Sequence, residues 1–341
     1  MSYLCGMDKE KGLLNDITPL TEDDIREMMK RRTKGLRTGL TFKGKNGTTE
    51  ELTLNTGITI VCASTGHGKT SFLNNIALRM ALNDGNDGAV VYFSYEISKG
   101  ELIGDLISTY VGESCKVKDG VSTQDSVIAH YKGDNSSLSD PDEWERKEKE
   151  LVDKAFASGK LLVVDKDYSA EELVEALTFY KSHIRTKLVL VDYAQMLYSS
   201  QRDRLRTEEI KHIVGRIAQF ANVNSLPVLM AAQFNQQALS PVSMTERNIG
   251  EGGDFSRIAN TIVGIYNLER LHPTLNAMED KQLVSLMASL GEPCQKNDGT
   301  IIPVRGRMLF KLIKRRGGQA DLYTVVEWDG RTKRFLVPAW I

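Results

Sequence analysis

The 341-residue chain is long enough to bury a sizeable core, and its length allows one large domain or two modest ones. Its 44 Lys and Arg residues nearly balance its 45 Asp and Glu residues, which gives a formal net charge of −1. This balance excludes a bulk polycation of the histone kind, so any binding to nucleic acid must come from local clusters of basic residues.

The cysteines and the start of the chain indicate a protein that is not exported. The four cysteines lie far apart and have neither Cys-x-x-Cys spacing nor a Cys/His metal pattern; they are Cys5, Cys62, Cys115 and Cys294. Residues 1–9 lack the charged-then-apolar design of a signal peptide, and no apolar run reaches membrane-spanning length. We therefore expect a soluble, cytoplasmic protein with reduced thiols.

Residues 1–34 differ in character from the rest, and we predict that they form an amino-terminal arm that contains a linker helix. Thr21 and Asp24 have the spacing of a capping box that starts a helix, and a basic run ends it. Its apolar side chains form a narrow stripe, which consists of Ile25, Met28 and Met29. This stripe either packs on the protein's own domain or docks onto a neighbouring subunit, and we carry the second alternative forward as a hypothesis.

The most informative stretch lies between an apolar strand-like run, residues 58–62, and a helical run, residues 71–78. It has the spacing of a phosphate-binding P-loop and consists of Ala63, Ser64, Thr65, Gly66, His67, Gly68, Lys69, Thr70 and Ser71. A triphosphate needs converging backbone N–H groups, small residues that allow close approach, a cation, and a hydroxyl ligand for Mg²⁺. The stretch therefore predicts a nucleotide site, with an ordinary Gly-rich turn as the alternative.

From residue 56 onward, strand-like runs alternate with helical ones, as is typical of a parallel α/β sheet. The runs are residues 89–93, 161–165, 187–192, 227–232 and 261–266. Residues 322–328 and 334–337 flank Asp329-Gly330, which predicts a hairpin. We expect an α/β domain over residues 35–341 with a mostly parallel central sheet, helices on both faces and a carboxy-terminal antiparallel hairpin. The charged residues 140–150 most simply form a solvated helix face.

Three of these strands end in polar side chains that suit phosphate chemistry. An apolar run ends in Asp192, which would lie beside Mg²⁺ at the carboxyl edge of the sheet. A second strand leads to Glu96, which can act as a base toward water, although a surface Glu is the simpler alternative. A third strand ends in Gln233, an uncharged amide that can sense the γ-phosphate without repelling it.

The order of these motifs resembles the RecA-type motor domain of DnaB-like replicative DNA helicases, over roughly residues 35–341. Five ordered segments carry the resemblance: Ala-x-x-x-x-Gly-Lys-Thr at residues 63–70, Ser94-Tyr95-Glu96-Ile97, Asp192-Tyr193-Ala194-Gln195, a Pro-strand-Gln-x-Asn segment at residues 227–235, and Lys314-Arg315-Arg316-Gly317-Gly318. The resemblance implies a RecA-like P-loop NTPase that forms a hexameric ring in a bacterial or phage-infected cell. It also implies Mg²⁺-dependent ATP hydrolysis, 5′ to 3′ translocation on single-stranded DNA, and unwinding of duplex DNA.

The resemblance implies a role for each matching residue. Those near the bound nucleotide are Lys69 for the phosphates, Thr70 and Asp192 for Mg²⁺, Glu96 as general base and Gln233 as γ-phosphate sensor. It implies that Lys314 and Arg316 reach the nucleotide of the adjacent subunit, where an Arg neutralises transition-state charge. Arg315 is the fallback for this arginine finger, and a solvated basic turn is the alternative.

DNA contacts are expected from two loops that face the centre of the ring, residues 199–206 and 239–253. The candidate residues are Arg202, Arg204, Arg206, Arg247, Glu251 and Gly253. Glu251 and Gly253 fit a family segment resembling Arg-Glu-Ser-Gly, whereas Gly250 stands where Arg is expected. For both loops the alternative is an ordinary solvent-exposed loop without a DNA-binding role.

The main departure from the family is the lack of the amino-terminal domain that typical members carry for primase contact and ring architecture. We therefore expect a compact phage or mobile-element version or a truncated chain, with a primase or a helicase loader as possible partners. Two rival hypotheses stay open. One is a RecA-fold recombination or remodelling ATPase that binds single-stranded DNA without unwinding, and the other is a non-catalytic, nucleotide-switched DNA-binding or loading factor.

Overall fold

The computed structural model describes residues 21–33, 35–44, 47–83, 88–112, 117–118, 121–200, 205–235, 240–250, 254–271, 277–296 and 298–337. The chain separates into two compact units, residues 1–35 and 36–341. None of the helices in the described ranges combines the length and the apolarity that a membrane crossing requires.

The arm helix, α2 (Glu22–Thr33), begins as the sequence predicts. The Thr21 hydroxyl accepts a hydrogen bond from the Asp24 amide at 3.1 Å, and the Asp24 carboxylate accepts one from the Thr21 amide at 2.9 Å. Ile25 and Met29 of the apolar stripe are 49% and 57% exposed, and the Met28 side chain lies outside the described set. Docking of this stripe onto a neighbouring subunit stays a prediction.

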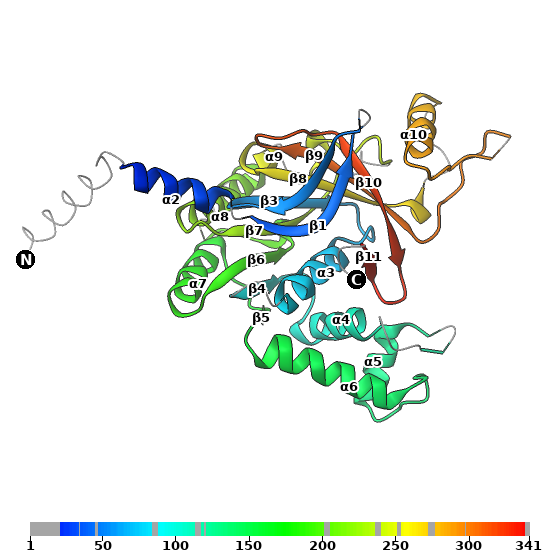
Figure 1. Ribbon diagram of the computed structural model, residues 1–341, viewed down its shortest axis with the longest axis horizontal. Helices are drawn as coiled ribbons and strands as arrows, with labels where there is room; N and C mark the ends of the chain where they lie inside the picture. The colour runs from blue at the N-terminus through cyan, green and yellow to red at the C-terminus, as the bar shows by residue number, and fades with distance from the viewer. Residues whose placement is uncertain are drawn as a thin grey trace, which may run out of the picture. The chain divides into compact units, whose positions relative to one another are not determined.

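The second unit is built on one sheet. Its eleven strands, counted over the described residues, follow the order β2-β1-β10-β9-β8-β3-β7-β6-β4-β5, with β11 beside β10 (Figure 1). The strands are β1 (Leu36–Lys43), β2 (Thr49–Leu54), β3 (Gly57–Ala63), β4 (Ala89–Ser94), β5 (Leu161–Val164), β6 (Thr186–Asp192), β7 (Pro227–Gln233), β8 (Thr261–Asn267), β9 (Arg307–Arg315), β10 (Leu322–Asp329) and β11 (Arg334–Leu336). The strands from β8 to β5 in this order are parallel, and all other pairs are antiparallel.

The parallel core and the final hairpin of β10 and β11 confirm the predicted mostly parallel α/β fold. The sequence analysis did not predict β1, β2 or β9. Strand β2, at the edge of the sheet, and its neighbour β1 alternate buried with partly exposed residues and carry many polar side chains. β9 contains buried Lys311, whose ammonium donates to the Met244 carbonyl at 2.9 Å, so that a lysine interrupts an otherwise apolar run.

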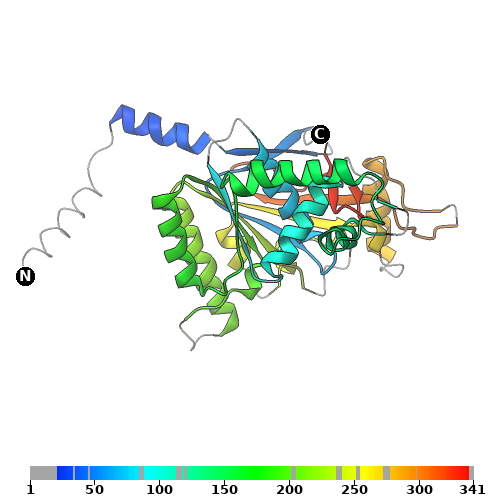
Figure 2. The same ribbon diagram turned by 90° about the horizontal axis from the view of Figure 1, so that it is seen from below.

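Helices cover both faces of this sheet, and Figure 2 shows the layers from a perpendicular view. One face packs against α3 (Lys69–Leu82), α4 (Lys99–Val111), α5 (Thr123–Tyr131), α6 (Pro141–Leu151) and the π-helical turn η1 (Val152–Ala157). The other packs against α7 (Ala170–His183), α8 (Arg206–Val223), α9 (Asp254–Ile258) and α10 (Ala277–Ser289). The 3₁₀ turns are η2 (Ala194–Met196), η3 (Glu246–Asn248) and η4 (Leu268–Arg270). The predicted solvated helix is α6, which also buries Trp144 completely.

Phe72, on the helix that follows the P-loop, tests how strongly the core holds this helix. Its ring is fully buried, and its centroid lies 5.3 Å from that of Phe310 and 5.9 Å from that of Phe335. We expect Phe72→Ala to lower the free energy of unfolding by about 3–5 kcal/mol, because it leaves a cavity between packed rings. Urea unfolding followed by circular dichroism measures this loss.

The matched control is Phe179→Ala on α7, where the side chain is 58% exposed. This substitution should cost less than about 1 kcal/mol. Equal losses for the two variants would contradict the packing described for α3.

Candidate nucleotide-binding site

The P-loop joins the buried strand β3 to α3, as the sequence predicts. Gly66 and Gly68 have φ of 75° and 87°, a backbone region that favours glycine. A Cβ on Gly66 would lie 2.4 Å from the Arg270 guanidinium, and one on Gly68 would lie 2.6 Å from the methyl group of Met308. The Arg270 and Met308 side chains are flexible and could move aside, so it is the positive φ that makes any larger residue strained at both positions.

The start of α3 is suited to an anion. No side chain caps this helix, and its first turn contains no acidic residue. The first backbone N–H groups of a helix have no intrahelical partners and carry the positive end of the helix dipole. The Lys69 side chain in the same turn is 8% exposed, and its ammonium lies 5.7 Å from the Tyr193 ring centroid. Together these groups form a cradle for a phosphate chain.

Asp192, at the end of β6, is a buried carboxylate that fits a cation. Its side chain is 1% exposed, and its Oδ1 atom has no hydrogen-bond partner among the described residues. Burial raises the pKa of this carboxyl to about 6, and the Glu96 carboxylate adds to the rise, whereas Thr70 and Lys69 oppose it. An uncompensated buried carboxylate is costly, so a cation beside Asp192 and Thr70 would stabilise its charged form.

This cation site differs from an all-protein metal site. Over the described ranges, no group of three or more His, Cys, Asp or Glu side chains is placed to hold a metal ion. Mg²⁺ commonly uses one or two protein ligands together with substrate phosphates and water. The Thr70 and Asp192 pair beside the P-loop matches that pattern.

The ends of β4 and β7 bring Glu96 and Gln233 to the same edge of the sheet. Ser94 is opposite Asp192 in the register of β4 with β6, and the Tyr95 amide donates to the Asp192 carbonyl at 2.8 Å. Glu96 follows directly and lies close enough to raise the Asp192 pKa. The side-chain amide of Gln233 donates through Nε2 to the Thr65 hydroxyl of the P-loop at 2.7 Å. The structure therefore gathers these predicted residues around one P-loop.

His67 is bonded to the end of β8 and lies within the electrostatic influence of Arg270, and the sequence analysis predicted neither. The Asn267 amide donates to His67 Nδ1 at 3.0 Å, so the neutral ring carries its proton on Nε2. Burial, together with the charges of Arg270 and Lys69, lowers the pKa of His67 to about 4. The ring also packs against Tyr266, with centroids 4.6 Å apart. The end of β8 and η4 thus hold the outer side of the P-loop.

Lys314 and Arg315 end β9 and Arg316 follows it; these three residues, named here the basic turn, have different hydrogen-bond partners. The Lys314 ammonium donates to the Ser256 carbonyl, and burial lowers its pKa. Arg316 is exposed, and its guanidinium lies 3.5 Å from the Arg257 carbonyl. Both side chains therefore reach the backbone of α9.

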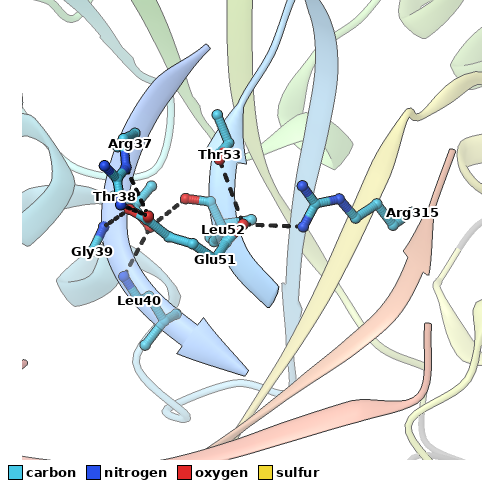
Figure 3. A network of polar contacts seen from close by, with 8 residues as sticks. All are labelled: Arg37, Thr38, Gly39, Leu40, Glu51, Leu52, Thr53 and Arg315. Carbon is cyan, nitrogen blue, oxygen red and sulfur yellow. Dashed lines mark hydrogen bonds and ion pairs between the residues drawn. The ribbon is translucent and has the colours of Figure 1, made fainter. Parts of the chain in front are cut away.

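Arg315 is held inside its own chain. Its guanidinium donates to the Glu51 carbonyl at 3.0 Å (Figure 3). It also pairs with the Glu50 carboxylate at 2.8 Å. The Glu51 carboxylate in turn accepts hydrogen bonds from the Arg37 guanidinium at 2.8 Å and the Gly39 amide at 2.9 Å. Arg315 thereby links β9 to β2, and through Glu51 to β1, so its role is structural.

The basic turn lies far from the P-loop of the same chain. Arg315 pairs with Thr261 at the start of β8, and Thr261 pairs with Thr59 near the start of β3. The P-loop follows Ala63, four residues further along β3, which is roughly 13 Å at a rise of about 3.3 Å per residue. The basic turn and the P-loop therefore occupy opposite edges of the sheet.

Most of the expected DNA contacts lie outside the described residues, namely Arg202, Arg204, Glu251 and Gly253. Arg247 is exposed on η3. The Arg206 guanidinium instead donates to the Gln195 carbonyl at 2.5 Å and pairs with Glu209 at 2.7 Å. These internal bonds give Arg206 an anchoring role, and its contact with DNA stays a prediction, as do the other five.

Comparison with known proteins agrees with this fold. Residues 42–282 match the family described as "DnaB-like helicase C terminal domain". The chain is similar to a solved structure described as an "ATPase Domain", with a TM-score of 0.61 and 18% identity, over 82% of this chain and 84% of that chain. It is also similar to "The Structure Of A DnaB-Like Replicative Helicase And Its Interactions With Primase", with a TM-score of 0.60 and 17% identity, over 83% of this chain and 57% of that one. A search of curated proteins finds no match.

The lowered pKa of His67 predicts a pH-dependent stability. Between the ordinary value of 6.5 and about 4, the unfolded chain binds a proton at His67 that the folded chain does not bind. The free energy of unfolding therefore falls as the pH falls through this window. Urea unfolding at pH 7 and pH 5 should show a loss for the wild type that exceeds the loss for His67→Gln by roughly 1–2 kcal/mol. Identical pH dependences would contradict the buried, neutral His67.

Proposed function

The chain belongs to the DnaB-like helicase C-terminal domain family, and from this premise we propose how its residues bind ATP, hydrolyse it and use single-stranded DNA. Membership makes it an ATP-hydrolysing DNA helicase of the replicative type. The roles of individual residues, the metal and the assembly are the proposal.

The P-loop binds the phosphates, with Lys69 beside the β- and γ-phosphates and the start of α3 supplying N–H donors. Thr70 and Asp192 hold Mg²⁺, a role supported by the buried Oδ1 atom of Asp192 without a partner among the described residues. The bound Mg²⁺ would offset negative charge on the phosphates. ATP and Mg²⁺ are thus the proposed substrate and cofactor.

Glu96 and Gln233 act on the γ-phosphate end of the site. Glu96 accepts a proton from the attacking water, since it is an exposed carboxylate beside Asp192 at the mouth of the P-loop. Gln233 exchanges its side-chain hydrogen bond to Thr65 for one to the γ-phosphate, because Thr65 belongs to the P-loop that would bind the phosphates. Its neutral amide adds no charge that would repel the phosphate.

A single observation carries the proposal that the active centre is shared between subunits: the basic turn and the P-loop lie at opposite edges of one sheet. Arg316 and Lys314 cannot serve their own nucleotide across this distance, so they act on the nucleotide of an adjacent subunit. Arg316 supplies the finger, since it is exposed, whereas Arg315 is engaged by Glu50 and Glu51. A closed ring, which we propose to be a homo-hexamer, gives every P-loop such a neighbour.

Single-stranded DNA passes along the two candidate loops in this proposal, and translocation runs 5′ to 3′. The primase named with one of the similar structures makes a primase the partner to test. A filament-forming recombination ATPase would use the same pocket. A basic turn supplied by a neighbour supports a head-to-tail assembly, and electron microscopy separates a closed ring from a filament.

Three variants separate the proposed roles. Lys69→Ala should weaken binding of a fluorescent ATP analogue at least about tenfold, because it removes the phosphate cation. Arg316→Ala should leave that affinity within about twofold and lower DNA-stimulated turnover by about 10³-fold or more. Arg315→Ala is the matched control and should keep turnover while lowering thermal stability. Equal loss of nucleotide binding in Lys69→Ala and Arg316→Ala would contradict the proposed role of Arg316 as an arginine finger.

Helicase activity is tested by strand displacement on duplexes that carry one single-stranded tail, either 5′ or 3′. In the presence of ATP the protein should displace the strand only from the duplex with the 5′ tail, because the proposed translocation runs 5′ to 3′. Glu96→Gln should abolish displacement while retaining nucleotide binding. Electron microscopy with an ATP analogue should show closed rings. Filaments, with DNA-stimulated hydrolysis but no displacement, would support the recombination alternative instead.

A further inference from the structure

The backbone of Gln233 is the point at which both candidate DNA loops meet the nucleotide site. The backbone N–H of Gln233 donates to Gln195 Oε1 at 3.2 Å, and Gln195 Nε2 donates to the backbone carbonyl of Gln233 at 3.2 Å. The register of β6 with β7 ends at Met230, so the Gln195 side chain continues the pairing where the strands have separated. This amide therefore acts as a substitute for a strand neighbour.

The same carbonyl also receives the second loop. The Gly250 amide donates to it at 2.8 Å, so that Gln195 and Gly250 occupy both acceptor positions of one oxygen. A Cβ on Gly250 would lie 3.0 Å from this oxygen and 3.8 Å from Gln195 Nε2. Close packing accounts for a glycine at the position where the family segment led us to expect Arg.

Gln195 itself is fixed at the root of the first loop. The Arg206 guanidinium holds its carbonyl at 2.5 Å and the Leu197 carbonyl at 3.1 Å. Arg206 lies in the first turn of α8 and pairs there with Glu209 at 2.7 Å. A continuous line of hydrogen bonds thus runs from Thr65 through Gln233 and Gln195 to Arg206.

We propose that Gln195 is a positioning residue that couples the nucleotide state of the site to both DNA loops. The inference rests on the proposed function, in which Gln233 senses the γ-phosphate and the loops bind DNA. When Gln233 leaves Thr65 for a phosphate, its backbone moves with it. Gln195 and Gly250 must then move as well, because they are bonded to the same carbonyl. Gln195 touches no nucleotide, so its effect is on coupling and not on binding.

The experiment measures the dissociation constant for fluorescent single-stranded DNA by anisotropy, once with a non-hydrolysable ATP analogue and once with ADP. The ratio of the two constants reports coupling, which is typically about 5- to 150-fold for linked sites. Gln195→Ala should bring this ratio to within about twofold of one. It should leave the affinity for the nucleotide itself within about twofold of the wild type.

Two further variants guard against a simple loss of folding. Gln195→Glu keeps the length of the side chain and places an oxygen where Nε2 donates to Gln233, and Gly250→Ala disturbs the same carbonyl from the other side. Both should lower the ratio while the protein stays folded, as judged by its circular dichroism spectrum. The matched control is Gln219→Ala, an exposed glutamine of α8, which should keep the wild-type ratio.

The outcomes are distinguishable. A wild-type ratio retained in folded Gln195→Ala and Gln195→Glu would overturn the inference and leave the proposed function standing. A ratio lowered equally by Gln219→Ala would also overturn it, because the effect would then be general to α8. A wild-type protein that binds DNA equally with both nucleotides would overturn the inference, whereas the proposed function fails only if strand displacement is absent.

Discussion

The direction in which each strand runs determines where the charged groups of this protein lie. Strands β3, β4, β6 and β7 are parallel, so the groups at their carboxyl ends gather at one edge. Strand β9 runs antiparallel to β8, so its carboxyl end delivers Arg316 to the opposite edge. One chain therefore carries the P-loop and the basic turn apart, and in the proposed function a neighbouring copy brings them together. In this account, dependence on assembly follows from the topology of the sheet.

Burial then gives these groups their chemistry. The Asp192 carboxylate has a raised pKa and one oxygen without a partner among the described residues, as expected of a group that a cation would stabilise. Arg315 and Arg316 are adjacent in sequence, yet Glu50 and Glu51 engage one of them while the other stays exposed. The same reasoning separates Arg206, held by internal carbonyls, from the exposed Arg247. Charge type alone would not have distinguished the members of either pair.

Local signals made much of the fold and the centre of the site predictable. The strand, glycine loop and helix around residues 57–82, the polar ends of three strands and the capping box at Thr21 all depend on spacing within one segment. The contact of Arg270 with Gly66 and the bond of Asn267 to His67 could not be predicted, because each joins residues about 200 positions apart. The same holds for the pairing of Gln195 with Gln233, which needs the end of β6 beside that of β7.

A subunit-mixing experiment tests the shared active centre most directly. Lys69→Ala subunits retain a finger and lack a working P-loop, whereas Arg316→Ala subunits retain the P-loop and lack the finger. Each variant alone should be nearly inactive in DNA-stimulated ATP hydrolysis. Mixed in equal amounts and reassembled, they should regain about a quarter of the wild-type rate, the fraction of interfaces at which both intact halves meet in random mixing. Mixtures as inactive as the separate variants would contradict an active centre built from two subunits.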